Sequence, residues 1–273
     1  MTTRIGKAFA RAAKEHRAAL VVFVEAGDPD LSTTERLLPA LAEAGADVLE
    51  VGIPFSDPIA DGPVIQRASE RSLAAGTTLP AVLDLLARLR GATDGVFGAA
   101  VVLFGYANPI LAMGEEAFVE RAKEAGADGV LLTDLPFEEA KSFAGRLRKA
   151  GLDFVSLVAP TSPDERLRKA AALSRGFLYL VSRTGVTGAR AALSEELPAL
   201  VTRVRTQASR IPLAVGFGIS TPEQAAAVAR LADGVVVGSA VVSSMEDAVR
   251  EGRDPVAAAA ERVKSLAAAM RRA

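Results

Sequence analysis

The chain alternates regularly between two kinds of segment, and this alternation limits its fold more than any other feature. Short apolar runs rich in β-branched residues are typical of strands buried on both faces, and the stretches between them have the periodicity of amphipathic helices. The predicted strands are Val21–Ala26, Ala46–Ile53, Gly98–Tyr106, Gly129–Asp134, Asp153–Pro160, Phe177–Ser182, Pro212–Gly218 and Gly234–Ser239. The predicted helices include Thr33–Ala44, Leu79–Arg90, Glu116–Ala125, Phe137–Ala150, Asp164–Ala172, Glu195–Gln207 and Pro222–Leu231.

Eight strand candidates separated by helices in a chain of 273 residues predict an α/β protein, a single (β/α)8 TIM barrel domain over residues 1–273. An open, doubly wound sheet is the alternative, but no G-x-G-x-x-G motif follows the first strand. Ahead of that strand, Ile5, Phe9 and Ala12–Ala13 form a helical stripe. We therefore expect an extra N-terminal helix that covers one end of the core.

Charge and composition exclude several classes of function. The 32 basic and 33 acidic residues give a net charge of −1, which leaves no electrostatic footprint for nucleic acid or for an anionic membrane surface. With no Cys and a single His, thiolate nucleophiles and Cys- or His-rich metal sites are excluded. The apolar runs are too short to span a membrane, and the N-terminus has no secretory apolar region, so we expect a cytoplasmic protein.

Two carboxylates stand out in the segment from Val48 to Pro63. Glu50 lies inside an apolar strand-like run, where a charge is costly unless it is paired, neutralised or used in chemistry. Asp61 lies on the following loop, which three prolines stiffen. A carboxylate on a strand and another on the next loop can form an acid/base pair at the carboxyl end of a barrel. The alternative is a local salt bridge at Glu50 and an ordinary turn at Asp61.

Glycines follow the last three predicted strands, in Ser182–Gly188, Gly216–Ser220 and Gly238-Ser239. Glycines allow backbone N–H groups to approach an anion closely, and a helix that starts at such a loop adds its positive end. Loops after the seventh and eighth strands are the usual phosphate site of barrels. We expect a phosphate site here, although the same glycines could serve tight turns alone.

Other residues narrow the chemistry further. Ser56 and Ser182 have no His partner for a Ser-His-Asp hydrolase, and every Lys lies in a helical pattern rather than in a strand, which disfavours Schiff-base chemistry. Tyr179, inside the sixth predicted strand, either points into the mouth of the barrel or fills its interior. Glycine and aspartate recur where helices end and strands begin, in Ala44–Asp47, Ala125–Asp128 and Leu231–Gly234. We expect these positions to serve the scaffold.

Several longer motifs, in fixed order, are similar to those of the tryptophan synthase alpha chain family. The resemblance runs from about Arg4 to the C-terminal helix. Its most specific segments are Ala26–Asp30, Leu49–Ala68, Tyr106–Ile110, Ala159–Pro163, Ser182–Ala189 and Gly216–Ser220. The family cleaves indole-3-glycerol phosphate to indole and glyceraldehyde 3-phosphate, without a metal or other cofactor, and passes indole to a beta chain that contains pyridoxal phosphate.

The resemblance implies a role for each matching residue. Glu50 would be the general acid and base, and Asp61 would accept the indole N–H and balance the charge that develops there. The positions that match or adjoin the family's substrate site are Phe23, Phe104 and Leu131 around indole, Gly188, Gly218, Gly238 and Ser239 around phosphate, Thr187 on the mobile lid, and the candidate Tyr179.

The resemblance also implies a partner, a beta chain in an alpha2beta2 heterotetramer, docked on the loop from Pro54 to Pro58 with Asp57 exposed. Two alternatives stay open. The chain could be a stand-alone lyase that releases free indole, or a weakly active subunit that mainly activates its partner.

One residue departs from the family pattern. The family usually carries a small Thr where this chain has Glu25, at the end of the first predicted strand. Strand alternation places Glu25 on the same side as Phe23, toward the pocket, whereas a rim position would turn it to solvent. We favour the rim position. A Glu25 that faced the pocket would raise the pKa of Glu50 by like-charge repulsion.

Overall fold

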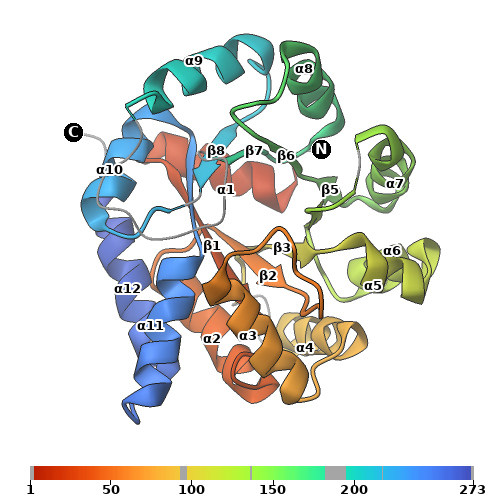
Figure 1. Cartoon of the computed structure of the whole chain (residues 1–273), viewed down its shortest axis with the longest axis vertical. Helices are drawn as coiled ribbons and strands as arrows, with labels where there is room; N and C mark the ends of the chain where they lie inside the picture. Colours follow the sequence, from red (N-terminus) through yellow and green to blue (C-terminus); the bar gives the residue numbers. More distant parts are fainter. Residues whose placement is uncertain (1–2, 93–96, 136, 182–194, 217, 272–273) are drawn as a thin grey trace.

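The computed structural model describes residues 3–92, 97–135, 137–181, 195–216 and 218–271, which form a parallel barrel surrounded by helices (Figure 1). The strands are β1 (Ala19–Glu25), β2 (Val48–Gly52), β3 (Ala100–Gly105), β4 (Gly129–Leu132), β5 (Asp153–Phe154), β6 (Ser156–Val158), β7 (Leu178–Val181), β8 (Leu213–Gly216) and β9 (Gly234–Val237). The helices are α1 (Arg4–Lys14), α2 (Leu31–Glu43), α3 (Pro63–Ala74), α4 (Leu79–Ala92), α5 (Ala107–Met113), α6 (Glu115–Glu124), α7 (Phe137–Ala150), α8 (Asp164–Leu173), α9 (Leu197–Gln207), α10 (Pro222–Leu231), α11 (Ser239–Arg250) and α12 (Pro255–Ala269).

The sheet confirms the predicted (β/α)8 barrel with its extra N-terminal helix. Neighbouring strands follow the order β5-β4-β3-β2-β1-β9-β8-β7-β6, and their pairings are parallel. The predicted strand Asp153–Pro160 is divided into β5 and β6, with Val155 between them. The N–H of Val155 still donates to the carbonyl of Val130, at 3.0 Å. One continuous run therefore pairs first with β4 and then with β7, which joins the two ends of the sheet.

Two helices of the structure were not predicted from the sequence. Helix α3 follows the loop that carries Asp61, and Pro63 occupies its first turn, where a missing N–H costs nothing. Helix α5 is only seven residues long and begins directly after β3. Pro54, Pro58 and Pro63 lead into α3, and Pro109 lies within α5. These prolines favour turns and loops, which is why neither helix was predicted from the sequence.

Side chains of the strands alternate between two apolar layers. On β1, Leu20, Val22 and Val24 belong to the outer cluster between sheet and helices, whereas Val21 and Phe23 belong to an inner cluster within the barrel. Because both layers are apolar, the strands appear in the sequence as continuous apolar runs. It also decides which side chains can reach the pocket at the carboxyl ends of the strands.

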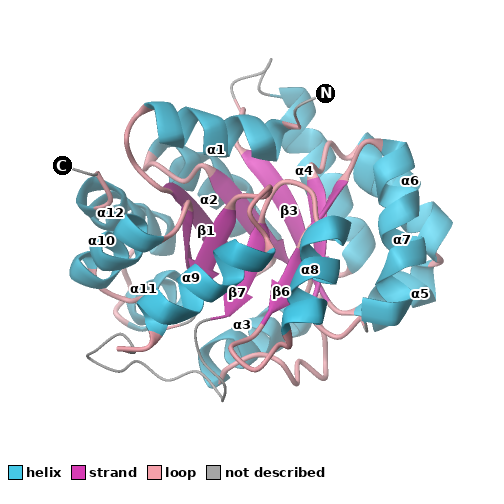
Figure 2. Ribbon diagram, turned by 90° about the horizontal axis from the view of Figure 1, so that it is seen from above, coloured by secondary structure: helices cyan, strands magenta, loops and turns pink. Residues whose placement is uncertain are grey.

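Helix α1 closes the end of the barrel opposite that pocket. Its Ile5 and Phe9 are buried in the inner cluster, and the ring of Phe9 stacks on Phe177 with centroids 5.3 Å apart. Glycine at position 234 leaves room for this contact, because a Cβ there would lie 2.9 Å from Cε1 of Phe9. Figure 2 shows α1 lying across one end of the strands. The predicted stripe is confirmed except at Ala13, which is exposed.

Three aspartates at the starts of strands hold the same end of the barrel together. Asp47, Asp128 and Asp233 each accept a hydrogen bond from the backbone N–H of a neighbouring strand, at 2.8 to 2.9 Å. Each also pairs with arginine: Asp47 with Arg11 and Arg17, Asp128 with Arg4 and Arg90, Asp233 with Arg205. The recurring helix-to-strand aspartate predicted from the sequence therefore serves the scaffold.

We expect Asp47→Ala to lower the free energy of unfolding by about 3 kcal/mol or more, because it leaves Arg17 without its buried partner and the N–H of Leu20 without an acceptor. Chemical denaturation measures this loss. The matched control is Asp84→Ala, which removes an aspartate that is 63% exposed and pairs with Arg121 at the surface. Such a pair contributes about 1 kcal/mol or less, so equal losses in both variants would contradict the prediction.

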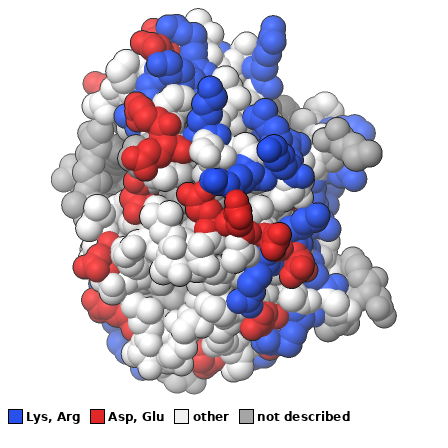
Figure 3. Space-filling model, turned by 90° about the vertical axis from the view of Figure 1, so that its right-hand side faces the viewer, with Lys and Arg blue, Asp and Glu red and all other residues white. Residues whose placement is uncertain are grey.

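Both charge signs occur on the face that contains the right-hand helices of Figure 1. Asp and Glu form a band across its middle, next to Lys and Arg side chains that lie mainly above and to the right, and much of the lower half is uncharged (Figure 3). No single helix of the described ranges is long and apolar enough to cross a membrane; only the pair α3 and α4, bent by 90°, meets the criteria of length and composition.

Candidate active site

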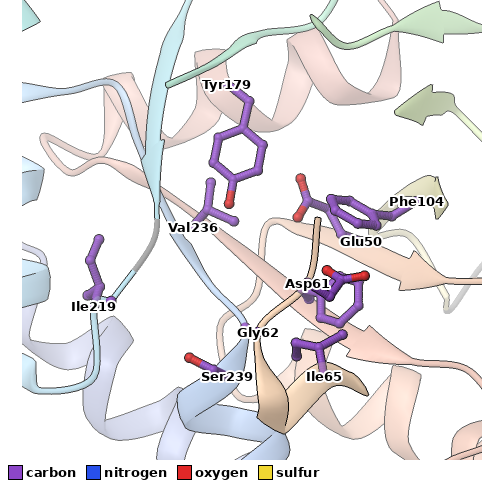
Figure 4. A pocket seen from close by; sticks show the side chains of 12 residues that line it. Glu50, Asp61, Gly62, Ile65, Phe104, Tyr179, Ile219, Val236 and Ser239 are labelled. Carbon is purple, nitrogen blue, oxygen red and sulfur yellow. The ribbon is translucent and has the colours of Figure 1, made fainter. Parts of the chain in front are cut away.

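A pocket opens at the carboxyl ends of the strands, inside the mouth of the barrel. Figure 4 shows Glu50, Asp61 and Tyr179 pointing into this space, with Ser239 and Ile219 on its other side. The residues that line it are Phe23, Glu50, Asp61, Gly62, Ile65, Phe104, Tyr179, Gly218, Ile219, Val236, Gly238 and Ser239. Nine of the predicted site residues lie within the described part of the chain, and this pocket brings together all of them but Leu131.

Glu50 is a fully buried carboxyl, and within the described part of the chain it has no ion pair and no hydrogen bond. It lies in the middle of β2 beside Phe23 of β1, and its side chain is 0% exposed. Neither carboxyl oxygen has a hydrogen bond among the described residues. Burial raises the pKa of Glu50 to about 8, so the side chain is a neutral acid at neutral pH. A neutral carboxyl facing a pocket can deliver a proton.

Asp61 is held on its loop by the hydroxyl of Tyr106. This hydroxyl donates to Oδ2 of Asp61 at 2.7 Å and accepts the N–H of Ala60 at 3.0 Å. The ring of Tyr106 also packs on Phe55, with centroids 5.2 Å apart. Burial raises the pKa of Asp61, and the hydrogen bond from Tyr106 opposes that rise. Tyr106 therefore favours the ionised form of Asp61 and fixes its direction.

We expect Tyr106→Phe to move the acid limb of the kcat/KM profile upward by about one pH unit or more. The variant keeps the ring but removes the donor, and a hydrogen bond to a charged group contributes about 1.5–3 kcal/mol. Without this donor the pKa of Asp61 rises, so a higher pH is needed to ionise it. Steady-state kinetics across pH test the shift, and an unchanged acid limb would remove Tyr106 from this role.

Aromatic and aliphatic side chains form the wall around the two carboxyls. The rings of Phe23 and Phe104 meet edge to face, with centroids 4.9 Å apart. Leu131 is paired with Phe104 across β3 and β4 and is fully buried in the inner cluster, but it does not line the pocket. Tyr179 lines it with its hydroxyl directed inward (Figure 4). Glycine at position 216 gives Tyr179 its space, since a Cβ there would lie 2.5 Å from the hydroxyl oxygen.

The opposite side of the pocket has the features expected for an anion site. Gly218 has φ of 81°, a conformation that favours glycine. Gly238 is the N-cap of α11 and Ser239 is its first residue, so the positive end of this helix faces the pocket. Thr187 and Gly188, predicted for the lid and the phosphate site, lie outside the described residues.

The expectation that Glu25 turns to solvent at the rim is wrong. Its side chain is 4% exposed and lies over Gly52, where a Cβ would be 2.6 Å from Oε2. The coupling to Glu50 that the alternative, a pocket-facing Glu25, would produce is not found, because burial alone accounts for the raised pKa of Glu50. The pKa of Glu25 is raised by burial first and then by the charges of Asp61 and Asp28. Glu25 thus interacts with the other carboxyl of the pocket.

Sequence reasoning gave no role to Tyr106, Ile65, Ile219 or Val236, which line or support the pocket. Tyr106 had the clearest signal, because it is the last residue of a predicted strand and belongs to a motif that was already identified. In the described ranges, no group of three or more His, Cys, Asp or Glu side chains is placed to hold a metal ion.

Comparisons with known proteins agree with this geometry. The family model for the tryptophan synthase alpha chain matches residues 9–271. The chain is 54% identical over 244 residues to the tryptophan synthase alpha chain of Geobacter sulfurreducens, with 89% of this chain and 90% of the relative covered. It is 51% identical over 251 residues to that of Gloeobacter violaceus, covering 92% and 89%.

Solved structures give the same result. A Mycobacterium tuberculosis tryptophan synthase chain superimposes with a TM-score of 0.89 at 36% identity and covers 100% of both chains. The tryptophan synthase alpha chain of Legionella pneumophila superimposes with a TM-score of 0.89 at 38% identity and covers 99% and 98%.

Proposed function

Because this chain belongs to the tryptophan synthase alpha chain family, whose members cleave indole-3-glycerol phosphate to indole and glyceraldehyde 3-phosphate, we propose that Glu50 and Asp61 carry out this lyase reaction. The observation that carries the proposal is the pairing of a buried, unpartnered acid with a carboxylate held by Tyr106 in one pocket. The two carboxyls have different environments, which suits them to different tasks.

The reaction needs a proton placed on a carbon atom. In the proposed mechanism, neutral Glu50 donates its proton to C3 of indole, which leaves positive charge on the indole nitrogen. Asp61 accepts the N–H and balances that charge. Ionised Glu50 then takes the proton of the hydroxyl on the adjoining carbon. The aldehyde C=O forms, the C–C bond breaks, and its electron pair restores the aromatic ring.

The substrate's two ends fit the two sides of the pocket. In our proposal the indole ring lies against Phe23 and Phe104, near Asp61, while the phosphate lies at Gly218, Gly238 and Ser239. Backbone N–H groups and the first turn of α11 would hold the phosphate without a Lys or Arg, which suits a pocket whose described lining residues include no basic side chain.

The alpha chain works with a beta chain in tryptophan synthase, as an alpha2beta2 heterotetramer. We propose that the partner docks on the loop from Pro54 to Pro58, next to Asp61. Supporting this, two exposed apolar side chains lie in a hollow that Asp57 and Pro58 also line: Ile59, directly after the loop, is 85% exposed, and Leu73 of α3 is 38% exposed. Solvent-exposed apolar residues of this kind favour an interface. We place this assembly in the cytoplasm.

The test is turnover of indole-3-glycerol phosphate by the purified chain, alone and with a beta chain. We expect indole and glyceraldehyde 3-phosphate in equal amounts, formed faster with the partner. Full activity without the partner would instead indicate a stand-alone lyase. No cleavage in either condition, with activation of the beta chain retained, would leave only the activating role.

A further inference from the structure

Helices α3 and α11 pack against each other, and each of them begins at the pocket. Asp61 lies just ahead of Pro63, the first residue of α3, and its backbone carbonyl accepts the side-chain amide of Gln66 at 3.0 Å. Asp61 is therefore tied to the first turn of α3. Helix α11 begins at Ser239, across the pocket from Asp61 (Figure 4). The two proposed ends of the substrate thus meet the first turns of two neighbouring helices.

An ionic bridge joins the same two helices farther from the pocket. Arg71 of α3 donates to both oxygens of Asp28, on the loop between β1 and α2, at 2.7 and 2.9 Å. It also donates to Glu246 of α11 at 2.9 Å, and Arg67 of α3 donates twice to Glu246, at 2.8 and 2.7 Å. Arg71 and Glu246 lie about 12 Å and about 10 Å along their helices from the first residues. The ionic bridge therefore joins three segments behind the pocket.

The ionic bridge adds direction to a contact that is otherwise apolar. Ile65 of α3 and Val242 of α11 belong to the same inner cluster, but apolar contacts have no preferred direction. Paired N–H···O bonds between arginine and carboxylate fix geometry as well as adding energy. The side chain of Asp28 is only 4% exposed, so its pair is weakly screened by solvent. The pKa of Glu246 is lowered to about 2, first by the hydrogen bond from Arg67, so Glu246 is ionised at neutral pH.

We propose that Arg71 and Glu246 are positioning residues of the lyase reaction: by fixing α3 against α11, they set the separation between Asp61 and the first turn of α11. This inference rests on the roles proposed above for Asp61 and for α11. A substrate that contacts both helices binds more tightly when their spacing is already correct, because less ordering is needed on binding. A displacement of about 1 Å at the reacting groups can cost about 10²-fold in rate.

Two variants loosen the ionic bridge without leaving a buried charge unpaired. Glu246→Gln keeps the size of the side chain and removes its charge. Arg71→Lys keeps a positive charge beside Asp28, but an ammonium group lacks the planar fork that binds two carboxylates at once. The matched control is Glu115→Gln, which breaks an ion pair with Arg146 between α6 and α7; Glu115 is 30% exposed and Glu246 is 26% exposed. No described lining residue of the pocket belongs to α6 or α7.

Binding of two phosphate compounds to the full chain, measured by isothermal titration calorimetry, tests the separation. A substrate analogue with an unsubstituted propyl chain between indole and phosphate contacts both helices, and it cannot be cleaved because it lacks the hydroxyl that must lose its proton. Glycerol 3-phosphate reaches the phosphate side alone. We expect Glu246→Gln and Arg71→Lys to weaken binding of the analogue by about tenfold, and binding of glycerol 3-phosphate by less than about twofold. Glu115→Gln should change neither.

Three results would overturn the proposal: equal losses for the two compounds, which would place the effect at α11 alone, unchanged binding of the analogue in either variant of the ionic bridge, or the same loss in Glu115→Gln. In the presence of a beta chain, kcat/KM for indole-3-glycerol phosphate should fall in Glu246→Gln and Arg71→Lys and stay at the wild-type value in Glu115→Gln. Failure of the proposed function has another signature, a wild-type chain that binds neither compound or an Asp61→Asn variant that remains fully active.

Discussion

Glu50→Gln is expected to lower kcat for cleavage of indole-3-glycerol phosphate by roughly 10²–10⁴-fold or more. Gln has nearly the same shape as Glu, so substrate should still bind, but it has no proton to give to the indole carbon and cannot take one from the hydroxyl. The loss should therefore appear in kcat, with a smaller change in KM. Single-turnover measurements with the partner present would measure the rate of the chemical step directly.

The same variant has an expected effect on stability that controls for misfolding. The pKa of Glu50 is about 8 in the folded protein, above its value of about 4.3 in an unfolded chain. A raised pKa means that the folded state loses stability as pH rises through this interval, by up to about 1.4 kcal/mol per pH unit. Glu50→Gln should therefore be at least as stable as wild type near pH 8. Substantial residual turnover in a well-folded variant would remove Glu50 from the role of proton donor.

The second large effect is expected for Asp61→Asn, a loss of about 10²–10³-fold in kcat. The amide keeps the size of the side chain and can still accept the indole N–H, but it carries no charge to balance the one that develops on the nitrogen. Its NH2 group would also face the hydroxyl of Tyr106 or the indole N–H as a second donor. The two carboxyl variants are thus expected to fail for different reasons.

The pH profile distinguishes these reasons. Wild type should show an acid limb from Asp61 and an alkaline limb near pH 8 from Glu50. In Asp61→Asn the acid limb should disappear from the residual activity while the alkaline limb remains. A residual profile that keeps both limbs would show that another group, rather than Asp61, must be ionised.

The barrel could be predicted from the sequence because its signal is repeated. Each strand is a short apolar run followed by an amphipathic helix, so an error of a few residues at Ala19 or Val155 does not change the count of units. The carboxyls Glu50 and Asp61 were also visible, since a charge inside an apolar run has few explanations. Helices α3 and α5 were not predicted, because Pro63 starts α3 directly after Gly62 and Pro109 lies inside α5, and such residues favour turns.

The details of the site depend on contacts between segments far apart in the chain. Tyr106 and Asp61 are 45 residues apart, and only the folded barrel shows their hydrogen bond. Glu25 needed the structure for another reason: strand alternation gave its direction, but the space over Gly52 that buries it comes from the neighbouring strand. The sequence therefore pointed to the carboxyls that we propose react more readily than to Tyr106, which holds one of them in place.

Helix α1, which closes one end of the barrel, has a consequence for how substrate enters and products leave. Ile5 and Phe9 fill the far end of the barrel in the described structure, so the pocket is open at its mouth, beside Asp61, and not at that far end. Substrate must enter and both products must leave on the side where we propose that the partner docks. Any segment that covers this mouth would control both substrate entry and product release. A partner bound beside the mouth would lie directly on the route by which indole leaves.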